Sequence, residues 1–302
     1  MSYANGNCKD RQKPHALQDS HLDFRLSRQA MLCTKNTMAF YSKTLGKFVE
    51  WLSDKGVTSP SQITTRQVRE YLIYHKQRGC SDSYIHTFAR SIRTYLHFLL
   101  EEKYITEAIT FKMPRIEQKL LPVLSLDEIR KVLDACENMR DSAIILFLVD
   151  TGLRRGEASA LNWGDVDLAT GLCLVRKGKG KKARSVVIGI RTRRTLLKYK
   201  QTISSQDDDP LFQTKTGSRL SGGGFRSMCS RLSEKTDIKI SPHALRRTFV
   251  VMSFKSGMSL AHIQALMGHS TPTMTLKYAQ LVEDDLVVAH REHGPVDSFI
   301  RQ

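Results

Sequence analysis

The sequence predicts a mainly α-helical protein of two domains, with one small β-hairpin or sheet in the second. Three observations lead to this fold class. The chain has 302 residues, about twice the length of a typical domain. Apolar residues recur at helical spacing through most of it. Only two short stretches, 172–175 and 185–190, have the pattern of strands, and a basic turn separates them.

The chain begins with a polar segment of mixed charge, residues 1–20, which we expect to be flexible. Residues 21–107 are predicted to form a helical bundle, because three apolar stripes follow one another at helical spacing. The stripes run through 40–52, 68–74 and 85–100. Their ends are marked by stop or cap residues, namely Gly56, Gly79 and either Thr64 or Thr65.

Residues 108–122 are expected to link the two domains, since Pro114 and Pro122 break helices and the charges between them favour water. The second domain opens with a capping box, in which Ser125 caps a helix and Glu128 returns the hydrogen bond. Further helices are predicted at 141–149, 191–203, 222–236 and after the Ser241–Pro242 cap.

The charge of the chain favours a polyanionic partner. Lys and Arg number 47 against 30 Asp and Glu, which gives a net charge of +17. The excess is +8 through residue 122 and +9 beyond it, and residues 176–200 hold 11 basic residues without an acid. Nucleic acid, clamped by both domains, is the simplest partner, and a basic protein without such a partner is the alternative.

Other classes of protein are disfavoured. The six cysteines lie at least 25 residues apart, which argues against a zinc site or disulfide framework and fits a reducing cytosol. The longest apolar run, 144–149, is too short to span a membrane, and the N-terminus lacks the apolar region of a secretion signal.

Two motifs contain candidate phosphate-binding arginines. In TGLRRGE, Arg154 follows a buried helix and a turn at Gly152, and Glu157 is close enough to orient it. Such a guanidinium can bind two phosphate oxygens, although a plain helix-end ion pair is the alternative. In HALRR, His243 and Arg246 share one helix face. They offer an imidazole and a cation together, or else a buried histidine with an arginine rim.

Two further motifs contain a candidate nucleophile and a candidate acid. GHSTPTMTLKY contains His269 and Tyr278, and nearby cations and a base can activate a tyrosine, whereas a core tyrosine is the alternative. In RKGKGKKAR, two glycines allow a tight turn that presents Lys179 as a proton donor to a leaving oxygen. Its neighbours are candidate DNA contacts: Lys177, Lys181, Lys182 and Arg184.

Together these residues suit phosphoryl transfer without a metal or cofactor, because positive side chains replace the cation that would neutralise the transition state. The acidic run Asp207–Asp209 is expected to be a solvated loop and not a magnesium site.

In this order and spacing, the four motifs resemble those of the tyrosine recombinase (phage integrase) family, close to its Xer-like members. The resemblance covers residues from about 21 to 281, and CSDSYIHTFARSIRTYLHFLLEEKYI looks like part of the core-binding domain. It implies a SAM-like core-binding domain at 21–107, a mixed α+β catalytic domain at 123–281 and a C-terminal tail at 282–302. The apolar stretch 286–289 of this tail would dock on a neighbouring protomer or pack in cis.

The resemblance also implies roles for the motif residues. Tyr278 would attack the scissile phosphate and form a 3′-phosphotyrosyl bond, while Arg154 and Arg246 clamp the non-bridging oxygens. Lys179 would protonate the leaving 5′-hydroxyl. His243 would act as general base, His269 would bind the phosphate, and Glu157 would brace Arg154. Arg247 stands where many members have histidine, a position without a catalytic role.

The activity implied is that of a site-specific recombinase, which exchanges strands of double-stranded DNA through a Holliday junction without metal or ATP. The family resemblance implies a homotetramer on DNA, a monomer or weak oligomer off DNA, accessory factors and a cytoplasmic, nucleoid-associated location. A type IB-like DNA topoisomerase, which shares this chemistry, and a non-catalytic DNA-binding regulator are the alternatives.

Overall fold

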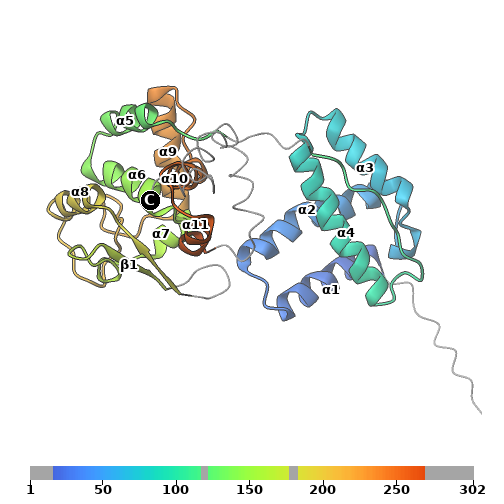
Figure 1. Ribbon diagram of the computed structural model, residues 1–302. Helices are drawn as coiled ribbons and strands as arrows, with labels where there is room; N and C mark the ends of the chain where they lie inside the picture. The colour runs from blue at the N-terminus through green and yellow to red at the C-terminus, as the bar shows by residue number, and fades with distance from the viewer. Residues whose placement is uncertain (1–15, 117–121, 177–182, 269–302) are drawn as a thin grey trace, which may run out of the picture. The chain divides into compact units, whose positions relative to one another are not determined.

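The computed structural model describes residues 16–116, 122–176 and 183–268. The chain divides into two compact units, Met1–Lys119 and Leu120–Gln302. Helices dominate both, and the sheet among the described residues has two strands (Figure 1). The predicted fold class is therefore confirmed.

Four α-helices form the described part of the N-terminal unit: α1 (Leu17–Ala30), α2 (Lys35–Asp54), α3 (Thr65–Gln77) and α4 (Asp82–Glu101), with a short 3-10 helix, η1 (Pro60–Gln62), before α3. The hydroxyls of Thr34, Thr64 and Ser81 cap α2, α3 and α4 by accepting hydrogen bonds from first-turn N–H groups. The core between the helices is rich in aromatic rings, which pack mostly edge to face: Phe24, Phe48, Tyr71, Phe88 and Tyr95.

Helix α1 begins inside the segment that the sequence predicts to be flexible. Leu17 is fully buried, and Ser20 Oγ lies 2.6 Å from Tyr95 Oη on α4. The expectation for residues 17–20 is therefore wrong. The helix buries few of its residues, chiefly Leu17, Ser20 and Phe24, so its sequence is too polar to show a clear apolar stripe.

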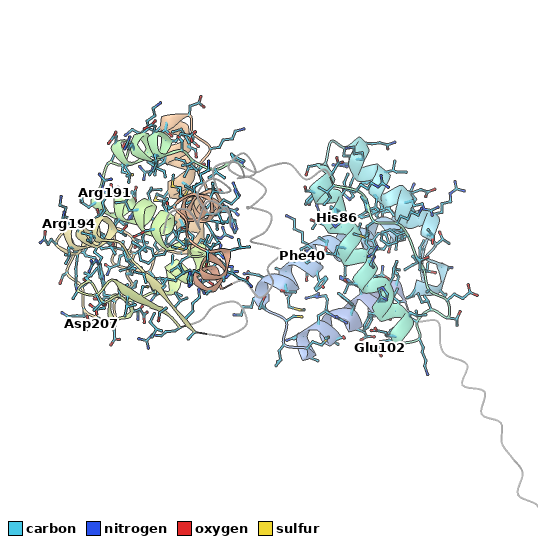
Figure 2. All side chains as sticks on the ribbon, in the orientation of Figure 1. Phe40, His86, Glu102, Arg191, Arg194 and Asp207 are labelled. Atoms are coloured by element: carbon cyan, nitrogen blue, oxygen red, sulfur yellow. The ribbon has the colours of Figure 1, made fainter. Side chains whose placement is uncertain are left out.

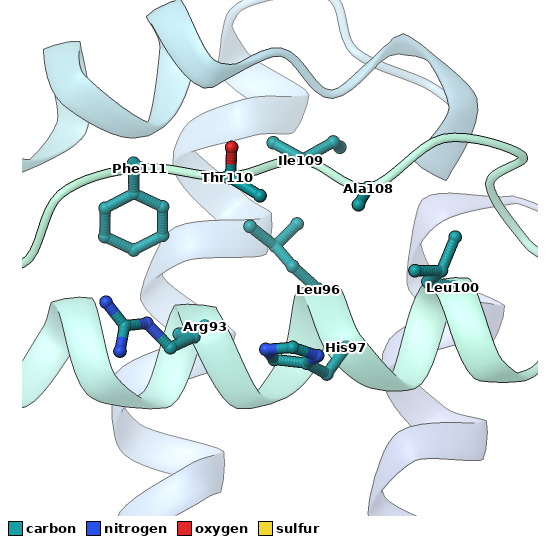
Figure 3. Close-up of a pocket in the computed structure, with 8 residues that line it drawn as sticks. All are labelled: Arg93, Leu96, His97, Leu100, Ala108, Ile109, Thr110 and Phe111. Carbon is teal, nitrogen blue, oxygen red and sulfur yellow. The ribbon is translucent and has the colours of Figure 1, made fainter.

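Residues 108–114 also differ from the predicted linker, because they pack back onto the N-terminal unit. Thr65 Oγ1 donates to the Thr110 carbonyl at 3.1 Å, and His86 Nδ1 lies 3.0 Å from the Pro114 carbonyl oxygen. A pocket of about 240 Å³ lies between this stretch and α4, lined by Arg93, Leu96, His97, Leu100 and Ala108–Phe111 (Figure 3). An irregular segment has no periodic pattern of apolar residues, so the sequence pattern cannot predict how it packs.

The second unit contains seven α-helices, one 3-10 helix and the hairpin among its described residues. They are α5 (Leu126–Asp134), α6 (Met139–Thr151), α7 (Arg155–Ala160), η2 (Trp163–Asp165), β1 (Leu172–Val175), β2 (Arg184–Val187), α8 (Ile190–Lys200), α9 (Gly222–Thr236), α10 (Pro242–Lys255) and α11 (Leu260–Met267). The predicted cap at Ser125 is present, with Glu128 N donating to Ser125 Oγ at 3.1 Å and Ser125 N to Glu128 Oε2 at 2.7 Å.

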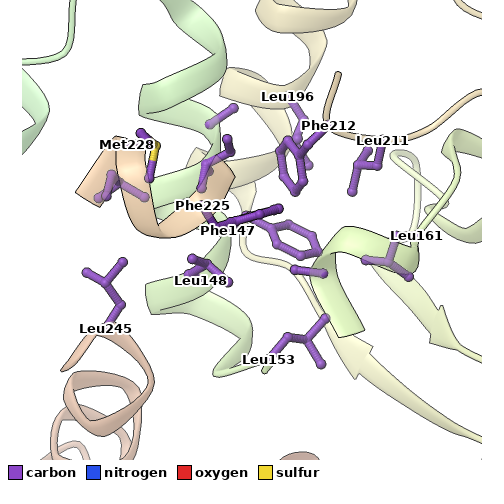
Figure 4. Packing of buried hydrophobic residues seen from close by; sticks show 14 of the residues in the cluster. Phe147, Leu148, Leu153, Leu161, Leu196, Leu211, Phe212, Phe225, Met228 and Leu245 are labelled. Carbon is purple, nitrogen blue, oxygen red and sulfur yellow. The ribbon is translucent and has the colours of Figure 1, made fainter. Parts of the chain in front are cut away.

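Helix α6 forms the centre of this unit. It is apolar on nearly all sides, and α8 and α10 pack against it. Phe147 of α6 meets Phe212 edge to face, and Phe212 meets Phe225 of α9 in the same way (Figure 4). A helix buried this completely is a rigid support for the residues that follow its C-terminal end.

Strands β1 and β2 pair antiparallel, with Val175 opposite Arg184. The basic turn between them includes residues 177–182, which lie outside the described residues. Arg184 therefore marks the point at which this turn rejoins the sheet.

Candidate active site

Arg154 is positioned by the tight turn at the C-terminal end of α6. Gly152 adopts a left-handed conformation with φ of 59°, and a Cβ there would lie 2.9 Å from Met267 Sδ and collide with the Phe249 ring. Only glycine fits this turn. Two residues later Arg154 precedes α7 in an extended conformation, and its side chain is 27% exposed.

Glu157 is the buried centre of an ion-pair network. Its Oε1 accepts from Arg154 Nη1 at 2.9 Å, and its Oε2 accepts from the Arg154 backbone N–H at 2.9 Å. Arg184 binds the same carboxylate through Nη2 at 2.8 Å and Nη1 at 3.2 Å. Burial by itself raises the pKa of Glu157, but the hydrogen bonds and charges of Arg184 and Arg154 outweigh it and lower this pKa. The carboxylate thus stays ionised and holds both guanidinium groups.

Arg246 lies inside the protein, with 6% of its surface exposed. Its Nη1 donates to the Gly152 carbonyl, and its Nη2 donates to the Met267 carbonyl at 2.9 Å. The first of these bonds ties α10 to the turn that precedes Arg154. The two candidate phosphate-binding arginines are therefore attached to the same short segment of backbone.

His243 stands in the first turn of α10, where Ser241 caps the helix and Pro242 begins it. This residue is more exposed than Arg246, although the protein still covers part of the imidazole. Partial burial, followed by the positive charges of Arg155 and Arg246, lowers the pKa of His243. The imidazole is therefore neutral at physiological pH and able to accept a proton.

A basic hollow of about 320 Å³ opens beside His243. Its cationic lining comes from Arg155 of α7, Arg226 of α9 and Lys239, and its hydroxyl lining includes Ser230 and Ser241. Guanidinium, ammonium and hydroxyl groups are the donors that bind phosphate in proteins. Among the described residues, no group of three His, Cys, Asp or Glu side chains is arranged to hold a metal ion. No helix in the described part of the chain is long and apolar enough to cross a membrane.

Several of the predicted site residues lie outside the described residues: Lys177, Lys179, Lys181, Lys182, His269, Tyr278 and the tail stretch 286–289. The structure does describe the residues next to two of these segments in the chain. Helix α11 ends at Met267, and Gly268, with φ of 60°, comes directly before His269 in the chain. Arg184 follows the lysine-rich turn.

Arg184, one of the predicted DNA contacts, is engaged within the protein. Its side chain is 13% exposed and is engaged by Glu157 and by the Leu266 carbonyl, which accepts from Nε at 2.8 Å. The strand pattern contains the signal that identifies its direction. Side chains alternate along β2, so Arg184 shares the face of buried Val186 and not the outer face of Ser185.

Arg247 and Thr248 hold the start of the second unit, a role that sequence reasoning misses. Arg247 donates to the Pro122 carbonyl from Nε at 3.1 Å and from Nη2 at 3.0 Å. Thr248 Oγ1 accepts from Leu124 N at 3.0 Å. The helix that positions His243 and Arg246 is thus bonded directly to the chain just after residues 117–121.

Comparison with protein families gives two matches. Residues 122–284 match the family described as "Phage integrase family", and residues 30–103 match "Phage integrase, N-terminal SAM-like domain". The first match alone spans more than half of the 302 residues.

Individual proteins give the same result. The chain is 29% identical over 275 residues to tyrosine recombinase XerC of Anoxybacillus flavithermus, a match that covers 86% of this chain and 91% of the relative. Among solved structures, a lambda integrase dimer bound to a COC′ core site matches with a TM-score of 0.74 and 18% identity, covering 87% of this chain and 95% of the other. The XerH site-specific recombinase bound to palindromic difH substrate matches with a TM-score of 0.71 and 23% identity, covering 90% and 84%. These structural likenesses show the fold.

Proposed function

This chain belongs to the phage integrase family and is a tyrosine-type site-specific DNA recombinase, and we propose that it cuts and rejoins DNA through a 3′-phosphotyrosyl bond at Tyr278. One observation supports this chemistry above the others. Arg246 is hydrogen-bonded to the Gly152 turn, and Arg154 follows this turn in the chain. The positive charges of both arginines help to lower the pKa of His243, which keeps the imidazole neutral.

The cleavage step uses the tyrosine oxygen as nucleophile. Tyr278 Oη gives its proton to neutral His243 and bonds to the scissile phosphorus, and the bond to the 5′ oxygen breaks. Lys179 gives a proton to that leaving oxygen. Arg154 binds Glu157 through Nη1, and its side chain is 27% exposed, so its Nε and Nη2 groups would bind the non-bridging oxygens.

The rejoining step reverses the first one. The 5′-hydroxyl of the second DNA strand gives its proton to Lys179, which lost one in the first step, and attacks the phosphotyrosine. The bond from phosphorus to Tyr278 Oη breaks, and Tyr278 leaves with the proton returned by His243. One phosphoester replaces another at each step, so no energy source is consumed. Guanidinium groups supply the positive charge that this transition state needs, which supports a reaction without metal or ATP.

The exchange of two strand pairs in turn passes through a Holliday junction within a homotetramer on two duplexes. Two features of the chain support such DNA binding. The net charge of +17 is shared by both units, and the hollow beside His243 is lined by cations. We place the reaction in the cytoplasm, on nucleoid DNA, with Glu157 bracing Arg154 and His269 contacting the phosphate.

Covalent capture tests the proposal. A pool of nicked duplexes with randomised sequence is incubated with the protein, and the DNA that survives denaturation on the protein supplies the cleavage site. The wild-type protein is expected to form this adduct, and Tyr278→Phe is expected to bind the same DNA without forming it. An adduct in the Tyr278→Phe protein would contradict the assignment. Relaxation of a supercoiled plasmid without the selected site would instead indicate a topoisomerase.

A further inference from the structure

The C-terminal end of α11 is held by two guanidinium groups. Arg246 Nη2 donates to the Met267 carbonyl at 2.9 Å, and Arg184 Nε donates to the Leu266 carbonyl at 2.8 Å. Carbonyls in the last turn of a helix lack N–H partners within it, and this end of the helix dipole favours positive charge. The two arginines therefore fix the place from which the chain continues, through Gly268, to His269 and Tyr278.

Arg184 also binds Glu157, so one side chain joins three parts of the site. It starts on β2, where the lysine-rich turn ends, and reaches the carboxylate that orients Arg154. The packing around it is close, because a Cβ on Gly268 would lie 3.1 Å from Arg184 Cζ. Arg184 thus connects the three segments that precede or follow Lys179, Arg154 and His269.

The two arginines on Glu157 are engaged differently. In Arg184 the Nε, Nη1 and Nη2 groups all donate within the protein, and the side chain is 13% exposed. In Arg154 only Nη1 donates to the carboxylate, and the side chain is 27% exposed. A guanidinium has five N–H donors, of which Arg184 uses three within the protein and Arg154 uses one on Glu157, so Arg154 has the larger and more exposed part of its guanidinium left for a phosphate.

We propose that Arg184 is a positioning residue for DNA cleavage and not a DNA ligand. The inference rests on the proposed function of this site. Arg184 fixes both oxygens of Glu157, which in turn fixes Arg154, and it fixes the Leu266 carbonyl at the start of the segment that contains the nucleophile. A lysine at this position would keep the charge but could not bind the carboxylate with two groups and the carbonyl with a third.

The test measures cleavage and binding separately. Arg184→Lys and Arg184→Met are compared with wild type on the nicked duplex recovered by covalent capture, in single-turnover reactions at saturating DNA. Arg194→Met is the matched control for a lost charge, because Arg194 on α8 is exposed and has no side-chain bond among the described residues (Figure 2). Binding is measured with the same duplex at several salt concentrations, and thermal unfolding verifies that each variant is folded.

The expected result is a slow but normally binding enzyme. Misplaced catalytic groups cost on the order of 10- to 100-fold in rate, so Arg184→Lys is expected to slow adduct formation by this factor. Its Kd and the salt dependence of Kd are expected to stay at the wild-type values, because no phosphate contact is lost. In the Glu157→Gln background, Arg184→Lys is expected to have a smaller effect on the rate, since the two residues act together.

Two results would show that Arg184 is not a positioning residue. A wild-type rate in Arg184→Lys would overturn the inference, and so would weaker binding in Arg184→Met with a salt slope reduced by about one phosphate contact. If Arg184→Met does not fold, the lysine variant decides. A wild-type protein that forms no adduct would overturn the proposed function itself, which distinguishes the two failures.

Discussion

The two units bury different kinds of polar side chain. In the described part of the N-terminal unit the buried polar residues include no acid and no arginine: they are Ser20, Thr44, His75 and Ser91. The second unit buries Asp141, Glu157, Asp165, Arg246 and Arg247. Buried charge is costly unless it is paired, so it is retained where a fixed position matters. Of the charges buried in the second unit, Glu157 and Arg246 belong to the candidate site, so this unit holds in place the charges that we propose take part in cleavage.

The largest effect is expected from Arg246, the more deeply buried of the two candidate phosphate-binding arginines. Arg246→Lys removes the fork that bonds both Gly152 and Met267, and it also removes the proposed guanidinium donor to the non-bridging oxygens. Loss of a preorganised donor of this kind costs on the order of 10²–10³ in rate. Single-turnover adduct formation measures it. The matched control in the N-terminal unit is Arg66→Met, whose side chain is 88% exposed and whose loss is expected to leave the saturated rate unchanged. Equal losses in both would contradict the division between the units.

The next effect separates chemistry from stability within the second unit. Asp141, like Glu157, is a buried carboxylate held by two arginines, Arg140 at 3.0 Å and Arg231. Asp141→Asn is expected to lower the free energy of unfolding by about 3 kcal/mol, the cost of breaking a buried pair, and to leave the cleavage rate of the folded protein unchanged. Glu157→Gln is expected to slow cleavage about tenfold. Denaturant unfolding measures the change in stability, and single-turnover cleavage measures the change in rate. A slowed Asp141→Asn enzyme would contradict the expected separation of stability from chemistry.

A smaller effect concerns the pH dependence of cleavage. Burial and the charges of Arg155, Arg246, Arg247 and Arg154 all lower the pKa of His243. Arg155→Met removes one of these charges, so the pKa of His243 rises and the imidazole becomes protonated at a higher pH. The acid limb of the rate profile is therefore expected to move to higher pH. Rates measured from about pH 5 to 8 test this, and an unmoved limb would mean that His243 is not the base.

The smallest effect compares the segments on either side of residues 117–121. Thr248→Val leaves the buried N–H of Leu124 without its acceptor, which costs about 1–3 kcal/mol. Thr65→Val removes the exposed bond to the Thr110 carbonyl, and it is expected to lower the free energy of unfolding by only a few tenths of the cost of Thr248→Val. Equilibrium unfolding of the two variants measures the difference. An equal cost in the two variants would contradict the expected difference between a buried and an exposed hydrogen bond.

Much of this architecture is predictable from local signals. The cap at Ser125, the turn at Gly152 and the Ser241–Pro242 helix start each depend on residues a few positions apart, and the structure contains them as predicted. The family motifs likewise lead to Arg154, Glu157, His243 and Arg246, which the structure brings into one unit.

The features that pattern analysis misses depend on contacts between distant segments. Arg184 looks like one more cation in a basic run. The alternation along β2 indicates its face, but its partner Glu157 lies 27 residues earlier and no local pattern identifies it. Residues 108–114 contain no periodic signal, yet they are bonded to α3 and α4. Leu17 and Ser20 are buried because α2 and α4 pack on α1, which no property of residues 16–20 reveals.

The most direct test of the account is the chemical identity of the protein–DNA bond. Wild-type protein trapped on the nicked duplex is digested with protease and nuclease, and the modified peptide is located by mass spectrometry. The account predicts a nucleotide attached through phosphate to Tyr278, in an amount that falls sharply in Arg246→Lys. A nucleotide on any other residue, or an unmodified Tyr278 in trapped complexes, would contradict it.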